Sequence, residues 1–366
     1  MKAVLLHENL EPYVSIISKS LPSTSPVPVL LNILIEATEK GLFISATDLE
    51  LGVKIKIPAK IEKTGALTVP GRQFVEVMSS ILSRKITLSQ TEQGLLIEAQ
   101  GGRAILQTIP KEEFPNLFEE KGEKIYSFKE GELKRTFSKL LFAVSLDGSR
   151  PELGGIYAVS TDAGIDFVAT DGFRLSLKRI KGKKILKEGK GIILSAKLAN
   201  EAMGLKNDTV DVYLHEEANQ ILFETQDIIF VGRLIHGSFP NYEKVLPKRA
   251  ETTIIVNKED FLGAIKLSSV FARESANIAK VSVQDNVLKI AARSSGIGEG
   301  EARVDVVQVG KNTDISFNVK FLIDLMKSID DKEVIMELNS AVEPAVFKTS
   351  KDPEFLHVIM PVRVQE

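Results

Sequence analysis

The sequence contains no cysteine among its 366 residues. This absence excludes disulfides, thiolate nucleophiles, and zinc or iron–sulfur sites that use cysteine ligands. Histidine is scarce as well, and the four residues, His7, His215, His236 and His357, are scattered without the spacing of metal ligands. We therefore expect no metal site and no catalytic histidine.

The chain also lacks long apolar runs. No window reaches the ~20 apolar residues that a membrane-spanning helix needs, and Glu8 follows soon after the short apolar run at the N-terminus. We expect a soluble cytoplasmic protein without a signal peptide or membrane contact. The net charge is only −2, so any binding of nucleic acid would need cations segregated onto one face.

Phosphate-binding glycine motifs are missing too. The run Gly296–Gly300 contains no basic residue and opens no helix, so it reads as a loop. Gly189-Lys190 lacks the upstream glycine and the following serine or threonine of a P-loop. With no nucleophile–base pair either, we predict no catalytic residues, no enzyme activity and no cofactor.

What is present is an ordinary globular composition, 43% hydrophobic and 26% charged, long enough for two or three domains. The chain also repeats itself. Ala46-Thr47-Asp48 recurs 123 residues later as Ala169-Thr170-Asp171, and Phe114-Pro115-Asn116 recurs 125 residues later as Phe239-Pro240-Asn241. These echoes divide the chain into three blocks.

The second copy of the Thr-Asp pair, Thr170-Asp171, is followed by a glycine. Around Asp171-Gly172, apolar and polar residues alternate on both sides, which predicts two strands joined by a tight turn. An ordinary turn is the simpler interpretation of this window, although Phe173 and Leu175 would leave a semi-exposed apolar shelf beside Arg174.

Periodicity predicts two helices and about eight strands in each block. The expected helices are 10–20, 70–83, 131–141, 194–204, 258–271 and 319–328; the segment 112–123 is expected to be a linker, and the last strand to span 354–364. An antiparallel sheet with two helices on one face does not close on itself. We predict an α+β fold of three similar domains, 1–122, 123–249 and 250–366, whose sheets join edge to edge with helices on a common inner side.

The expected helices and their ends carry fourteen lysines and arginines but only seven carboxylates, a net of +7 against −2 for the whole chain. A lysine-rich wet face is the simpler explanation. In a ring, the same charge would suit a protein that encircles duplex DNA without reading its sequence.

Three motifs carry a family resemblance. The segments 169–175, 239–247 and 358–364, supported by 30–53, closely resemble the bacterial DNA polymerase III beta subunit, the processivity sliding clamp. This resemblance implies three clamp-type domains, a head-to-tail homodimer that forms a ring around duplex DNA, and processive replication. It also implies partners that carry clamp-binding peptides, namely the replicative DNA polymerase, clamp-loader subunits and repair polymerases.

The resemblance assigns residues to each surface. The peptide pocket would contain Leu153, Thr170, Gly172, Phe173, Arg174, Leu175, Pro240, Lys244, Val245, Val358, Ile359, Met360, Pro361, Val362 and Arg363. DNA would contact Arg72, Lys139, Arg150, Lys197 and Lys266, and the dimer interface would involve Ala104, Leu106, Val270 and Phe271. Family members often have histidine at Phe173, arginine at Lys244, an aromatic residue at Ala104 and a basic residue within 22–25.

Two rival hypotheses belong to other classes. An enzyme could use Asp171 and Arg174 at the turn, although the chain shows neither a nucleophile–base pair nor a cofactor motif. A repeat scaffold without a DNA role would scatter its cations over both faces. A bound nucleotide or metal would favour the first hypothesis, and the distribution of surface charge tests the second.

Overall fold

The computed structural model describes residues 1–116, 120–183, 186 and 190–363. The chain forms two compact units, each built from two stretches of sequence. Unit 1 comprises Met1–Leu133 with Lys197–Leu234, and unit 2 comprises Lys134–Ala196 with Ile235–Glu366. The first and third predicted blocks each lie within one unit, whereas the middle block contributes strands to both.

Six α-helices lie in the described residues, two in each predicted block. They are α1 (His7–Lys19), α2 (Gly71–Ser80), α3 (Glu132–Phe137), α4 (Ala196–Met203), α5 (Lys258–Ala272) and α6 (Val319–Ser328). The expected helices 258–271 and 319–328 agree with α5 and α6 to within one residue. The expected helix 131–141 is too long, because α3 ends at Phe137 and a 3-10 turn follows at Leu141–Ala143.

Unit 1 contains two antiparallel sheets. The first has the strand order β5 (Ala59–Lys63), β1 (Lys2–Leu6), β7 (Lys85–Thr91), β8 (Gly94–Ala99) and β9 (Gly102–Leu106). The second has the order β10 (Glu123–Lys129), β15 (Thr209–His215), β16 (Gln220–Glu224), β17 (Ile228–Arg233), β4 (Leu51–Ile57), β3 (Gly41–Thr47), β2 (Asn32–Thr38) and β6 (Gly65–Pro70). The pairing of β17 with β4 joins the middle block to the first edge to edge, as predicted.

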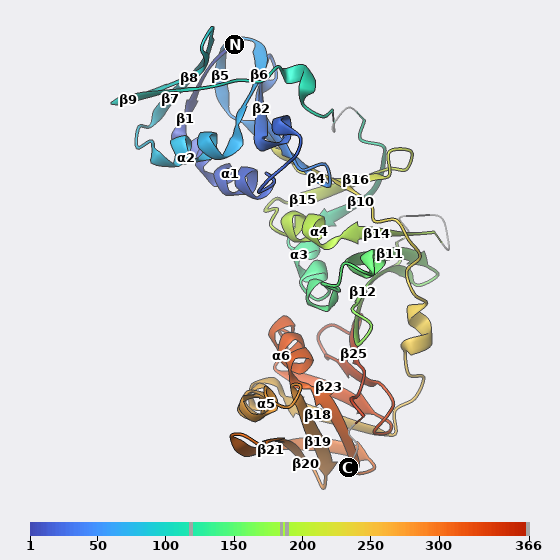
Figure 1. The fold of residues 1–366 in the computed structure, drawn as a ribbon. Helices are drawn as coiled ribbons and strands as arrows, with labels where there is room; N and C mark the ends of the chain where they lie inside the picture. The colour runs from blue at the N-terminus through green and yellow to red at the C-terminus, as the bar shows by residue number, and fades with distance from the viewer. Residues whose placement is uncertain (117–119, 184–185, 187–189, 364–366) are drawn as a thin grey trace. The chain divides into compact units, whose positions relative to one another are not determined.

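Helices α1 and α2 lie side by side in unit 1 (Figure 1). Leu10 and Ile17 of α1, and Phe74 and Met78 of α2, are buried at helical spacing. Burial of these faces removes apolar surface from water, which contributes roughly 1.5–3 kcal/mol for each large side chain. The amphipathic pattern therefore explains why both helices pack onto the strands.

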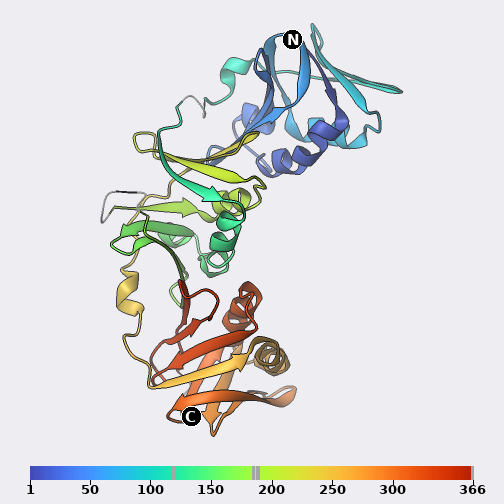
Figure 2. The same ribbon diagram turned by 180° about the vertical axis from the view of Figure 1, so that it is seen from behind.

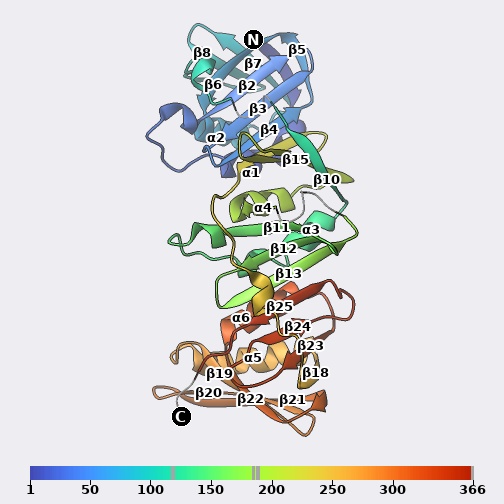
Figure 3. The same cartoon turned by 90° about the vertical axis from the view of Figure 1, so that its right-hand side faces the viewer.

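Unit 2 contains one long antiparallel sheet. Its order is β14 (Gly191–Ser195), β11 (Gly155–Thr161), β12 (Gly164–Thr170), β13 (Arg174–Lys181), β25 (Phe355–Ile359), β24 (Ala345–Lys348), β23 (Glu333–Leu338), β18 (Thr252–Asn257), β21 (Gly298–Gly310), β20 (Val287–Ser294), β19 (Ile278–Gln284) and β22 (Thr313–Asn318). Figure 3 shows β13, β25, β24, β23 and β18 following one another. The pairing of β13 with β25 joins the middle block to the third.

Helices α5 and α6 cover one side of the third block's strands (Figure 2). Each begins at an asparagine that caps it: the Asn257 side chain accepts hydrogen bonds from the backbone N–H groups of Glu259 and Asp260, and Asn318 accepts one from Lys320. Phe261 of α5 and Leu322 of α6 are fully buried in the same core.

Strand β12 is buried along its whole length. On one face, the Phe167 ring meets Phe137 edge to face at 5.9 Å between centroids. On the other face, Val168 belongs to a smaller apolar cluster with Leu175, Val358 and Tyr242. This second cluster lies under the segment that leaves the middle block.

Some sequence features fall outside the described residues. These are Val364, part of the expected linker 112–123, and Gly189 of the Gly-Lys pair. The last strand ends at Ile359 and not at 364. The glycine run Gly296–Gly300 forms the turn and first residues of the β20–β21 hairpin, which agrees with a loop assignment.

Candidate functional site

The repeated Thr-Asp pair builds the same turn twice. In the second copy, the Thr170 hydroxyl donates to the carbonyl of Arg174 and accepts from Gly172 N–H, and Asp171 Oδ1 accepts from the N–H groups of Phe173 and Arg174. In the first copy, Thr47 and Asp48 make the four corresponding bonds. The repeat therefore holds at the level of individual atoms, and the predicted hairpin of β12 and β13 is confirmed.

The turn's third position requires a left-handed backbone. Gly172 has φ +90°, which glycine adopts without steric cost, and Phe173 beside it is 65% exposed. The Phe173 carbonyl accepts the N–H of Met360 at 2.9 Å, so the C-terminal tail continues beyond β25 along the hairpin.

Strand register decides which side chains face the site. Leu175 lies opposite Val358, and Arg174 lies opposite Ile359. Because successive side chains of a strand point to opposite faces, Leu175 and Val358 belong to one apolar cluster while Ile359 belongs to the core under α5 and α6.

The remaining wall is the exit segment, which we define as Phe239–Leu246; it includes a 3-10 turn at Tyr242–Val245. Together the hairpin, β25 and the exit segment enclose a pocket of ≈ 240 Å³. Its lining is mostly apolar and consists of Arg150, Leu153, Thr170, Gly172, Arg174, Leu175, Phe239, Pro240, Asn241, Tyr242, Val245, Val358 and Met360.

Nine of the fifteen residues predicted for a pocket line this one. They are Leu153, Thr170, Gly172, Arg174, Leu175, Pro240, Val245, Val358 and Met360. Sequence reasoning missed Phe239, Asn241 and Tyr242, and it assigned Arg150 elsewhere. The repeated Phe-Pro-Asn motif was the available signal for the first two.

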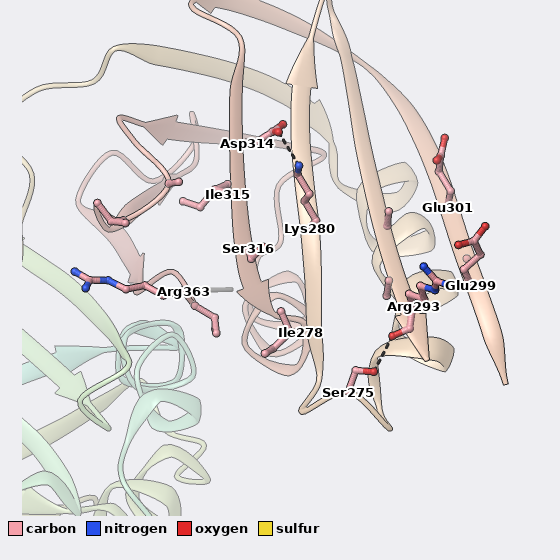
Figure 4. Close-up of a pocket in the computed structure, with 16 residues that line it drawn as sticks. Ser275, Ile278, Lys280, Arg293, Glu299, Glu301, Asp314, Ile315, Ser316 and Arg363 are labelled. Atoms are coloured by element: carbon pink, nitrogen blue, oxygen red, sulfur yellow. Dashed lines mark hydrogen bonds and ion pairs between the residues drawn. The ribbon is translucent and has the colours of Figure 1, made fainter. Parts of the chain in front are cut away.

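Six predicted residues lie outside the lining. They are Phe173, Lys244, Ile359, Pro361, Val362 and Arg363. Ile359 is fully buried on the opposite face of β25, for the reason given above. Val362 and Arg363 line a second cavity of ≈ 880 Å³ on strands β19, β20 and β22 (Figure 4). There the N–H of Val362 donates to the carbonyl of Ser316 at 2.8 Å.

Arg174 is a structural residue and not a cation at the rim. Its side chain is only 10% exposed, its Nε donates to Asp171 at 3.0 Å, and one terminal nitrogen donates to Asp324 of α6 at 2.8 Å. The guanidinium also lies over the rings of Phe321 and Phe142, 4.6 and 5.5 Å from their centroids. These contacts account for both residues of the rival active-site hypothesis.

His357 is fully buried close to Phe142 and Arg174. Its Nδ1 is 2.7 Å from the Ser176 hydroxyl, and its ring contacts Phe142 at 5.1 Å between centroids. Burial, with a smaller contribution from the charge of Arg174, lowers the pKa of His357 to about 3. The ring is therefore neutral at physiological pH.

Of the five predicted DNA contacts, Arg150 lines the pocket, and the other four have different surroundings. Lys266 is exposed on α5, and Arg72 is exposed on α2 while donating to the Ser23 carbonyl at 3.0 Å. Lys197 is 43% exposed and pairs with Asp48. Lys139 is only 12% exposed and pairs with Asp352. The buried pairing of Lys139 argues against a DNA contact.

The expected positive charge of the helices is not observed. Within the bounds of the six helices in the described residues there are nine lysines and arginines and eight carboxylates, a net of +1. The value of +7 was too high because the count took in Arg84, Lys85, Lys139, Lys206 and Arg273, which lie beyond the helix ends, and left out Glu8 of α1.

The predicted interface residues lie near two sheet edges. Ala104 and Leu106 are half-buried on β9, the edge strand of the five-stranded sheet. Val270 on α5 is 51% exposed, and Phe271 packs so closely on Gly300 of β21 that a Cβ there would lie 2.4 Å from its ring. Among the described residues, Gly298–Asp305 of β21 pair only with β20.

Other kinds of site are not observed in the described ranges. No three histidine or carboxylate side chains there come together as metal ligands. None of the helices described has the length and hydrophobicity to cross a membrane.

Comparison with known proteins identifies the family. Models of the N-terminal, central and C-terminal domains of the DNA polymerase III beta subunit match residues 1–118, 127–241 and 243–363 in that order. The beta sliding clamp of Staphylococcus epidermidis is 28% identical over 357 residues, 94% of each chain.

Solved structures agree over the full length. The DNA polymerase sliding clamp of Bacillus subtilis is 26% identical with a TM-score of 0.92, and a sliding clamp from Bartonella birtlesii, described as bound to griselimycin, is 27% identical with a TM-score of 0.92; each match covers 100% of both chains. The chain belongs to the bacterial DNA polymerase III beta subunit family of three-domain sliding clamps, which are processivity factors of replication and not enzymes.

Proposed function

We propose that two copies of this chain, joined head to tail, close around duplex DNA in the cytoplasm and tether the replicative polymerase through the ≈ 240 Å³ pocket. The domains of each subunit are 1–122, 123–249 and 250–366. The observation that carries the proposal is the pocket itself, because it collects apolar side chains from three remote segments of a chain whose family consists of sliding clamps.

The pocket suits an extended peptide. Leu153, Leu175 and Val358 form an apolar floor, and Arg150, whose side chain is 51% exposed, supplies a cation at the opening. Burial of two or three apolar anchors at ~25 cal/mol per Å², less ordering costs, gives micromolar affinity in order of magnitude. Polymerases, clamp-loader subunits and repair proteins with such peptides would exchange on one clamp.

The dimer is supported by two unpaired sheet edges. Strand β9 presents Ile105, 42% exposed, and the Gly298–Asp305 edge of β21 lies beside Val270 and Phe271. Unpaired edges attract other strands unless they are covered. Because the two edges differ, their pairing is heterologous, and a closed head-to-tail dimer covers both.

DNA contact would be electrostatic and independent of sequence. Lys266, Arg72 and Lys197 remain the candidates, since Lys139 is paired and only 12% exposed and Arg150 lines the peptide pocket. A few phosphate contacts give weak, salt-sensitive binding. Retention on DNA must therefore come from the closed ring and not from affinity.

Retention on circular DNA tests this proposal. A clamp loaded onto nicked circular duplex should stay bound through gel filtration at moderate salt and leave when a restriction enzyme cuts the circle. Equal loss from circular and linear DNA would contradict encirclement. Lys266→Glu should impair loading or retention, and Lys311→Glu, which reverses an exposed lysine paired with Glu251, is the matched control.

A second measurement tests the pocket. Met360→Asp should abolish binding of a synthetic glutamine- and leucine-containing peptide, because the new carboxylate would be desolvated by the peptide. Val309→Asp, at a site 68% exposed and outside the pocket lining, should bind normally. Normal binding by Met360→Asp would show that the peptide site lies elsewhere.

A further inference from the structure

The exit segment forms a wall of the pocket without belonging to any sheet. Phe239, Pro240, Asn241, Tyr242 and Val245 line the pocket. Within the ranges that the structure describes, no backbone hydrogen bond joins Phe239–Leu246 to a strand; the Leu246 N–H donates to the Glu243 carbonyl inside the segment. The position of this wall must therefore be fixed by side chains.

Aromatic rings provide part of that attachment. The Phe239 ring stacks on Tyr157 of β11 with centroids 4.7 Å apart and planes 5° apart. The Tyr242 ring meets the same Tyr157 edge to face at 6.4 Å. Stacked rings resist separation, but the stacking preference is broad and does not by itself fix one ring at a single position over the other.

A polar contact fixes the position of Tyr242 along strand β12. The Tyr242 hydroxyl donates to Asp166 Oδ2 at 3.0 Å, in a site where Tyr242 is 7% exposed and Asp166 1% exposed. Asp166 is held in turn by Arg179 of the neighbouring strand, whose Nε and terminal nitrogen donate to its two oxygens at 2.6 and 2.7 Å. A bidentate arginine fixes both the charge and the orientation of a carboxylate.

We propose that Asp166, oriented by Arg179, positions Tyr242 and so keeps the exit-segment wall in its binding geometry before a partner arrives. We call these three residues the Tyr242 anchor. The inference rests on the proposed function for the nature of the partner. Burying a carboxylate without partners costs free energy of folding. Besides its pair with Arg179, the Asp166 carboxylate accepts a hydrogen bond from the hydroxyl of Tyr242, which lines the pocket. Tyr242 is thus a positioning residue.

The Tyr242→Phe variant tests the anchor. It keeps the ring that lines the pocket, removes the hydroxyl, and leaves the Asp166–Arg179 pair intact. We expect the full-length variant to bind a fluorescent glutamine- and leucine-containing peptide about tenfold more weakly, because the wall must be ordered on binding. We also expect faster amide hydrogen exchange across 239–246 in the free protein.

The chain supplies a matched control. Tyr126 is 8% exposed and donates its hydroxyl to Glu132 Oε1 at 3.0 Å, in unit 1 and outside the pocket lining. Tyr126→Phe loses a comparable buried hydrogen bond, so it reports the effect of stability alone. We expect it to bind the peptide as the wild type does and to leave exchange across 239–246 unchanged.

The outcomes separate cleanly. Weaker binding with faster exchange in Tyr242→Phe alone supports the anchor. Unchanged exchange across 239–246, or an equal loss of affinity in both variants, overturns it. If the wild-type protein does not bind the peptide, the proposed function fails, and the exchange comparison still decides whether the hydroxyl holds the segment.

Discussion

Two half-buried lysines of unit 2 pair with one half-buried carboxylate. Asp352 accepts from Lys139 and Lys178, and Lys139 also lies 5.1 Å from the centroid of the Phe355 ring. Burial acts to raise the pKa of Asp352, but the two lysines outweigh it and the pKa is lowered. Because Lys139 and Lys178 belong to the middle block and Asp352 to the third, the cluster ties the two blocks beside the β13–β25 pairing.

His357 makes stability depend on pH. The folded pKa of His357 is lowered to about 3, whereas the ordinary pKa of a histidine in an unfolded chain is 6.5. Between these values unfolding takes up a proton, so stability falls as the pH falls through that window. Urea unfolding from about pH 7 to about pH 5 should show a slope approaching 1.4 kcal/mol per pH unit from this residue.

The His357→Asn variant serves as the comparison. Asparagine can still hydrogen-bond the Ser176 hydroxyl but does not titrate, so the pH dependence of unfolding should flatten. An unchanged slope in this variant would assign the acid sensitivity to other groups.

Ala276 carries avoidable backbone strain. This exposed alanine has φ +53°, in the left-handed region that costs an alanine about 1–2 kcal/mol. Ala276→Gly removes that strain but adds unfolded-chain entropy, and the net effect should be a stabilisation of about 0.5 kcal/mol. Thermal unfolding should show a higher midpoint.

A second exposed alanine controls for flexibility. Ala218 lies in the turn of the β15–β16 hairpin, and its φ is not among the positive values of the described chain. Ala218→Gly should therefore be neutral or destabilising. A stabilisation of equal size in both variants would contradict the strain argument.

Asparagine caps stabilise the N-terminal ends of helices α5 and α6. Asn257 accepts from two backbone N–H groups, at 2.9 and 3.3 Å, and Asn318 from one at 3.0 Å. Replacing an asparagine cap by alanine typically costs about 1 kcal/mol. Asn257→Ala should thus lower the free energy of unfolding by about that amount in urea titrations, and Asn257→Asp should restore most of it. Equal losses in both variants would indicate that packing, and not the cap, is responsible.

Periodicity predicted the elements that bury one clear face. Helices α5 and α6 agree closely with expectation, and the hairpin at Gly172 could be predicted because only a turn places Asp-Gly between two alternating runs. Strands β5 and β22 were not predicted, since both are edge strands whose short sequences mix charged and apolar residues. Strand β14 was partly merged into a predicted helix because Leu194 suits both patterns.

For the candidate site, the sequence predicted the segments that form the pocket but not which of their residues line it. A motif names a stretch of chain, but strand register decides which of its residues face the pocket. Val358 and Met360 face it while Ile359 does not, as the two-residue period of a strand requires. Tyr242 could not be assigned from the sequence, because its role depends on Asp166, 76 residues earlier in the chain.

At the scale of the whole molecule, the charge of the helices indicates a DNA clamp less strongly than the edge-to-edge pairing of strands does. The helices in the described residues net only +1, so electrostatics alone would not have suggested a DNA clamp. Edge-to-edge pairing is the stronger signal, since β17–β4 and β13–β25 already join successive blocks within each unit. A head-to-tail dimer extends the same rule to the edge of β9 and to the Gly298–Asp305 edge of β21.

Val270→Asp tests that dimer directly. Val270 is 51% exposed on α5 near the unpaired edge of β21, and burying a carboxylate without a partner costs several kcal/mol at each of two equivalent interfaces. We expect light scattering to give a dimer mass for the wild type and a monomer mass for Val270→Asp. Val307→Asp is the control. Val307 is 60% exposed on β21, but it lies in the part of that strand that already pairs with β18. Its mass should remain that of a dimer. A dimeric Val270→Asp protein with normal retention on circular DNA would mean that the ring closes through other surfaces.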